Sequence, residues 1–128
     1  MEVVNLVIRT HTTGLVTCTT TTSSVTLPDV TGHVKCIAIK PSGTSTNFAI
    51  SATKAGVVET IFGATPVAVN ATGIVVTPQK LAVDRDNGAL TVTSNTYVDF
   101  VLDHHDVTIA VTNCANAETY VVEILVEE

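Results

Sequence analysis

Short stretches of alternating apolar and polar residues recur along the whole chain, and none sustains the spacing of an amphipathic helix. The clearest of these stretches are residues 107–112 and 119–126. Because successive side chains of a strand point to opposite faces, each stretch predicts a strand with one buried face. The residues predicted to share inward faces are Val4, Leu6, Ile8, Val98, Phe100, Leu102, Val107, Ile109, Val111, Tyr120, Val122, Ile124 and Val126.

Gly, Pro, Asn and Asp residues separate these segments and predict about ten short strands. The expected strands span residues 3–9, 15–22, 24–27, 33–40, 48–53, 57–62, 97–102, 107–112 and 119–126, with a hairpin over 81–94. Two short pieces, 67–69 and 74–77, are expected as edge strands or as a loop with extended conformation. Residues 28–32, which include Pro28 and Asp29, predict a turn. We therefore expect an all-β fold: a single-domain antiparallel β-sandwich over residues 1–128, with jelly-roll or immunoglobulin-like topology.

The composition adds a prediction about the surface. Hydrophobic residues make up 45% of the chain and charged residues 14%, and the mean hydropathy is +0.42. Roughly one residue in six is threonine, far above ordinary usage. A surface of Thr, Ser, Ala and Asn is weakly hydrated and suits burial against other protein subunits. The alternative is a soluble β-domain whose surface carries little charge.

The formal net charge of −6 is unevenly distributed along the chain. Residues 1–83 contain five bases and three acids, whereas residues 84–128 contain one base, Arg85, and nine acids. Nucleic-acid binding is not expected, because neutralising phosphates requires clustered Lys and Arg. The polarity permits head-to-tail contacts between copies, unless the two parts interleave in the fold and the asymmetry disappears.

Two polar clusters are candidate metal sites. Asp103, His104, His105 and Asp106 lie between two predicted strands, so we expect them on a loop. Asp99, His11 or His33 could join them as metal ligands, or His104 and His105 could form a pH-sensitive subunit contact. A solvated turn is the simpler interpretation. The other cluster, residues 84–88 (Asp-Arg-Asp-Asn-Gly), resembles a calcium loop but lacks its later Glu, and Asn-Gly favours a hairpin turn.

The remaining chemistry indicates no catalyst. Cys18, Cys36 and Cys114 are odd in number and widely spaced, so neither a disulfide framework nor a zinc site is expected, and reduced thiols fit assembly in a cytoplasm. Motifs of nucleophilic, phosphate-binding and zinc-hydrolase sites are absent from the sequence. We expect no enzyme, no cofactor and no catalytic or metal-binding residues. Asn70 begins a glycosylation sequon, which has no meaning without secretion.

No targeting segment is expected either. The chain runs from Met1 directly into an apolar stretch with Arg9 after it, which is unlike a secretory signal peptide. The longest apolar runs are far too short to span a membrane, so no membrane association is expected.

In size, composition and strand pattern the chain resembles the small virion proteins of tailed bacteriophages, in particular capsid decoration or cement proteins and head-completion or tail proteins. The resemblance implies a non-enzymatic structural protein that binds the major capsid protein or other virion subunits, often as a homo-oligomer. It also implies assembly in the host cytoplasm and location in the virion. The edges of strands 3–9 or 119–126 could add to a neighbour's sheet. The alternative is a sandwich that binds carbohydrate or a cell-surface ligand, although sugar platforms usually need exposed aromatic residues.

Overall fold

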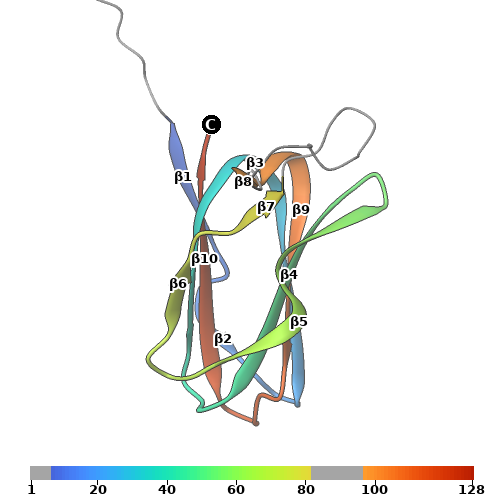
Figure 1. Cartoon of the computed structure of the whole chain (residues 1–128). Helices are drawn as coiled ribbons and strands as arrows, with labels where there is room; N and C mark the ends of the chain where they lie inside the picture. The colour runs from blue at the N-terminus through green and yellow to red at the C-terminus, as the bar shows by residue number, and fades with distance from the viewer. Residues whose placement is uncertain (1–6, 82–96) are drawn as a thin grey trace, which may run out of the picture.

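All regular elements in the described part of the chain are β-strands (Figure 1). The computed structural model describes residues 7–81 and 97–128. Its strands are β1 (Ile8–Thr12), β2 (Val16–Thr17), β3 (Thr22–Pro41), β4 (Thr46–Lys54), β5 (Val57–Val69), β6 (Ile74–Val76), β7 (Gln79–Leu81), β8 (Tyr97–Asp99), β9 (Val101–Thr112) and β10 (Thr119–Glu127). All paired strands are antiparallel. The predicted all-β antiparallel fold of about ten strands is therefore confirmed.

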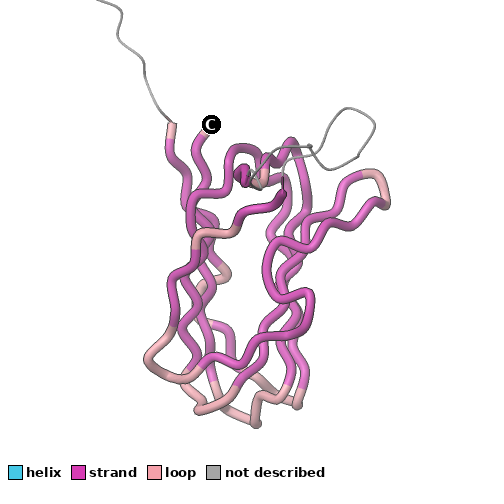
Figure 2. The backbone as a smooth tube through the Cα atoms, viewed as in Figure 1, coloured by secondary structure: helices cyan, strands magenta, loops and turns pink. Residues whose placement is uncertain are grey.

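The strands face each other in two layers (Figures 1 and 2). The hydrogen-bonded order is β1-β10-β3-β9-β4-β5, with β2 also paired to β10 and β6 to β3. One layer contains β1, β2, β10, β6 and the C-terminal half of β3. The other contains the N-terminal half of β3, then β9, β4 and β5. A separate short pair, β7 and β8, lies at one end.

Strand β3 belongs to both layers, which the sequence did not predict. The predicted turn at residues 28–32 is wrong, because the chain continues as one strand through this segment. Two register shifts occur between Leu27 and Gly32, and Asp29 has a φ of 56°. Pro28 is tolerated in a strand because this half of β3 has no described partner strand on its other side. The irregularity bends β3 from one layer into the other.

One hydrophobic core fills the space between the layers. Phe48 and Tyr120 meet edge to face within it, with ring centroids 5.7 Å apart. The inward residues predicted for 107–111 and 120–126 are buried, as are Phe100 and Leu102. Two predictions are wrong, because Ile8 is 57% exposed and Val98 is 39% exposed. Val4 and Leu6 lie outside the described residues.

Several predicted strand boundaries differ from the observed ones. The predicted strands 57–62 and 67–69 are one strand, β5, because Gly63 and Pro66 occupy a bulge rather than a turn. The predicted strand 15–22 is reduced to the two residues of β2. The predicted strand 97–102 is divided between β8 and β9 at Phe100. Beyond Leu81, the predicted hairpin 81–94 lies outside the described residues.

Candidate interaction surface

An open groove lies on the outer face of the layer that contains β10. The four strands of this face follow the order β2-β10-β3-β6, so β10 and the C-terminal half of β3 form the floor. Val121 pairs with Lys40, and Glu123 pairs with Ala38. Paired residues of an antiparallel ladder point to the same face, so these four side chains share the floor. The groove has a volume of about 740 Å³.

Two exposed apolar side chains stand on opposite sides of this groove. Leu15, in the connection before β2, and Val75, in β6, are each 72% exposed. The Val75 side is completed by the turn from Asn70 to Gly73, in which the Gly73 amide donates to the Asn70 carbonyl at 2.9 Å. Lys40 Nζ donates to the Ala71 carbonyl at 2.8 Å and so ties the floor to this turn. Ala71 and Thr72, the second and third residues of the sequon, thus line the groove.

A second apolar feature projects from the other layer. The hairpin between β4 and β5 extends away from the body of the molecule (Figure 1). Val57 and Val58 near its tip are 72% and 64% exposed. The turn itself uses Ala55 and Gly56 at φ angles of 52° and 80°. A tight turn of this kind holds the two strands together as a ribbon.

The Asp103 to Asp106 cluster is not on a loop, which corrects the sequence-based expectation. It lies within β9, and His104 adopts a φ of 55°. Lys54 Nζ donates to Asp103 at 3.0 Å, His104 Nδ1 contacts Asp29, and His104 Nε2 lies 3.7 Å from Asp103. His105 Nδ1 accepts the backbone amide of Asp103 at 2.8 Å. Each side chain therefore stabilises local structure where β9 crosses the bend of β3.

The other candidate ligands do not join this cluster. Asp99 accepts a hydrogen bond from Lys35 Nζ at 2.7 Å and lies 4.0 Å from His33. The Lys35 contact, with a further hydrogen bond from Gln79, lowers the pKa of Asp99. His11 lies elsewhere on β1, and its buried Nε2 has no hydrogen-bond partner. Within residues 7–81 and 97–128, no three His, Cys, Asp or Glu side chains converge as a metal site would require. Residues 84–88 lie outside the described residues.

The contact between His104 and Asp29 makes stability depend on pH. The hydrogen bond and the charge of Asp29 raise the pKa of His104 above its usual value of 6.5. A histidine whose pKa is higher in the folded state than in the unfolded state stabilises the fold fully at pH values below its unfolded-state pKa. This stabilisation is lost as the pH rises through the folded-state pKa. We therefore expect His104→Gln to lower the melting temperature at about pH 5.5 and to have much less effect at about pH 9.

Asp29→Asn is the matched variant, because Asn tolerates the positive φ of residue 29. Thermal melts of both single variants and the double variant would be compared at the two pH values. We expect the double variant to melt at low pH no earlier than the single variants, within error. A loss of melting temperature that is the same at both pH values in each single variant would contradict this assignment.

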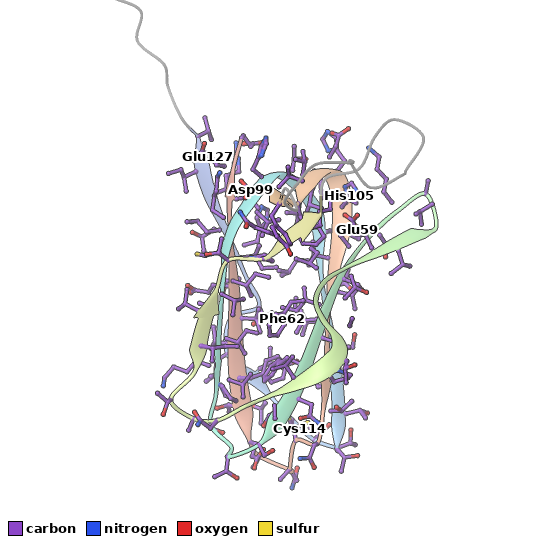
Figure 3. The ribbon with its side chains drawn as sticks, in the orientation of Figure 1. Glu59, Phe62, Asp99, His105, Cys114 and Glu127 are labelled. Atoms are coloured by element: carbon purple, nitrogen blue, oxygen red, sulfur yellow. The ribbon has the colours of Figure 1, made fainter. Side chains whose placement is uncertain are left out.

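Charged side chains gather at one end of the molecule, where Glu59, Asp99, His105 and Glu127 lie opposite to Cys114 (Figure 3). Part of the charge asymmetry of the sequence is neutralised in space. Bases of the first part pair with acids of the second: Arg9 with Glu128, Lys35 with Asp99 and Lys54 with Asp103. The two parts interleave, so head-to-tail attraction between a basic and an acidic half is not supported.

Two further sequence-based expectations concern edges and aromatic residues. β10 lies between β1 and β3, so it is not a free edge, and the expectation that 119–126 adds to a neighbour's sheet is wrong. β1 is at the edge of the hydrogen-bonded strand order.

Of the five aromatic residues, Phe48, Phe100 and Tyr120 are buried, Phe62 is half-buried and Tyr97 is 57% exposed. A platform of several exposed aromatic rings, as sugar binding usually requires, is therefore not formed.

Comparison with known proteins gives no guide to function, so functional inference rests on the fold and on the groove and hairpin tip described above. No protein-family model, curated protein or solved structure matches the chain. In the described residues no helix is long and apolar enough to cross a membrane. The molecule is thus defined by its class, an antiparallel β-protein of two layers with an apolar outer groove.

Proposed function

We propose that the protein is a non-enzymatic structural subunit that assembles with its own copies and stabilises a bacteriophage virion, binding the major capsid protein as a decoration or cement protein. The observation that carries the proposal is the pair of exposed apolar features: the groove between Leu15 and Val75, and the hairpin tip of Val57 and Val58. Exposed apolar side chains gathered beside a groove and at a hairpin tip support contact with other protein. Assembly takes place in the host cytoplasm.

The hairpin tip of one copy is the proposed occupant of the groove of the next copy. The groove floor is two strands wide and the hairpin is a two-stranded ribbon, so their widths match. Fully burying a Val or Leu side chain contributes about 1.5–3 kcal/mol, so four such side chains exceed the lower estimates of the entropy cost of association. Each contact is modest, and a closed ring gains stability from many of them.

The geometry of this contact is head to tail. The groove lies on the layer of β10, whereas the hairpin belongs to the layer of β4, so the two surfaces on one copy are different. A heterologous contact between different surfaces produces a ring when the rotation closes and a filament when it does not. A ring of low-charge β-domains is suited to cover the junctions between capsid subunits.

The test is the mass in solution, measured by light scattering over a range of protein concentrations. We expect a discrete oligomer for the unmodified protein and monomers for two variants: Leu15→Glu with Val75→Glu, and Val57→Glu with Val58→Glu. Mixing the two variants restores one groove and one tip that fit each other, so the mixture is expected to form a dimer and nothing larger. Val101→Glu, at a 53% exposed site outside both surfaces, is the control and retains the oligomer.

Two results would contradict the proposal. A strictly monomeric unmodified protein would exclude self-assembly, and a mixture that remains monomeric would exclude the tip-in-groove contact. Circular dichroism of each variant confirms that the strands are retained. The virion assignment is tested separately by cosedimentation with shells assembled from the major capsid protein of the same genome. Failure to cosediment would remove the decoration role while leaving the self-assembly result intact.

A further inference from the structure

Two connections far apart in the sequence lie against each other at one end of the molecule. The first follows β2 and the second joins β9 to β10. The amide of Cys18 donates to the Glu118 carbonyl at 2.8 Å, and the amide of Ala117 donates to the Cys18 carbonyl at 2.9 Å. The amide of Cys114 donates to the Thr21 carbonyl at 3.4 Å. These bonds fix the relative positions of Cys18 and Cys114.

Both cysteine side chains are buried at this end of the molecule. Cys18 is 1% exposed and Cys114 is 2% exposed, and both belong to the same buried cluster. The Cys114 thiol donates to the Thr20 carbonyl at 3.3 Å. Burial, followed by the hydrogen bond with Cys114, raises the pKa of Cys18 to about 12. The pKa of nearby Tyr120 is raised, mainly by burial and also by the charges of both cysteines.

We propose that Cys18 and Cys114 form a redox-responsive pair that closes to an intramolecular disulfide when the protein meets a low-molecular-weight disulfide such as oxidised glutathione. One protein thiolate attacks the glutathione disulfide, forming a mixed disulfide and releasing one glutathione. The second protein thiolate then attacks the protein sulfur of the mixed disulfide and releases the other glutathione. The protein loses two electrons and two protons, and both glutathione molecules carry them away as thiols.

This bond would join the two layers of the fold. Cys18 follows β2, which pairs with β10, whereas Cys114 follows β9 of the opposite layer. The closed loop contains most of the chain, and cross-links that close long loops restrict the unfolded state most. Because both thiols are buried and Cys18 stays protonated near neutral pH, closure is slow and requires opening of the connections.

The consequence for the molecule rests on the proposed function. A particle assembled in a reducing cytoplasm and released into an oxidising medium would meet the conditions that close the bond only after assembly. The closed form would then be harder to unfold. The disulfide itself does not depend on any partner, so it can be tested on the isolated protein, and its failure would leave the self-assembly proposal untouched.

The experiment uses the variant Cys36→Ser, because Cys36 is half-buried on the outer face and would react with glutathione on its own. The folded variant is incubated with oxidised glutathione, and free thiols are then alkylated in denaturant. We expect a mass lower by two hydrogen atoms, no bound glutathione, and a cross-linked peptide pair containing Cys18 and Cys114. The melting temperature of the oxidised form is expected to rise by an amount on the order of 10 °C and to return on reduction.

The matched controls are Cys18→Ser and Cys114→Ser, each combined with Cys36→Ser. Neither can form the internal bond, so neither should gain thermal stability on oxidation. The proposal is overturned if the folded Cys36→Ser protein retains a single bound glutathione as its end product. It is equally overturned if both thiols stay reduced after an incubation in which an alkylating reagent, added to a parallel sample without glutathione, modifies Cys18 and Cys114.

Discussion

Phe48→Ala is expected to destabilise the protein by about 3–5 kcal/mol, the largest effect of any single substitution considered for this fold. Phe48 is fully buried and its ring packs edge to face against Tyr120. Alanine removes the contact between the layers and leaves a cavity. The cavity persists because β4, which carries residue 48, is paired with β5 on one side and β9 on the other and cannot collapse into the space. Urea unfolding followed by circular dichroism measures the change in the free energy of unfolding.

Phe62→Ala is the matched control. Phe62 is half-buried, packs against the core and lies between the layers (Figure 3). Because part of its ring already contacts water, its removal exposes less apolar surface, and we expect a distinctly smaller loss than for Phe48. Equal losses for the two variants would contradict the assignment of Phe48 to the fully buried part of the core.

The inward residues of the long C-terminal strands could be predicted from the sequence because their alternation is regular. In β10, Tyr120, Val122, Ile124 and Val126 are all buried, as the period of two requires. The same rule fails at Val98, where the chain forms only a three-residue strand paired with β7. A short strand at the end of the molecule has no opposite layer to bury it. Alternation predicts which side chains share a face, and the opposite layer determines whether that face is buried.

Turn signals were less informative than alternation. Pro28, Asp29 and Gly32 predicted a turn, and the structure places them in a bend within β3. Proline and positive φ interrupt a regular ladder in either case, so local chemistry cannot distinguish a reversal of the chain from a bulge. The deciding factor is long-range: residues 33–41 find new partners in β10 and β6.

The candidate surfaces depend on topology even more strongly. Leu15 and Val75 are sixty residues apart in the chain, and only the order β2-β10-β3-β6 places them on opposite sides of one groove. The proximity of Cys18 and Cys114 has the same origin. Their spacing showed no motif, and their proximity follows from the antiparallel course of two connections. Sequence patterns identify strands, whereas sites between connections require the order of those strands.

Gly63→Ala is expected to cost about 2–4 kcal/mol, although it adds one methyl group. Gly63 has a φ of 73° and closes the bulge where residues 63–66 of β5 lie opposite Ala49 of β4. A Cβ at this position would lie 2.6 Å from the Phe48 carbonyl oxygen. That atom is backbone, so it cannot rotate away, and β4 and β5 must separate locally beside Phe48.

Gly56→Ala separates the two causes of this loss. Gly56 has a φ of 80° in the hairpin turn, and a Cβ there meets nothing within 4 Å. The substitution Gly56→Ala therefore costs only what alanine loses by adopting a left-handed backbone conformation, about 1 kcal/mol. Denaturant unfolding of both variants gives the difference, which reports the steric contact at Gly63 alone. Equal losses of unfolding free energy in the two variants would mean that β5 moves freely relative to Phe48. The bulge at Gly63 would then not hold Phe48 in position.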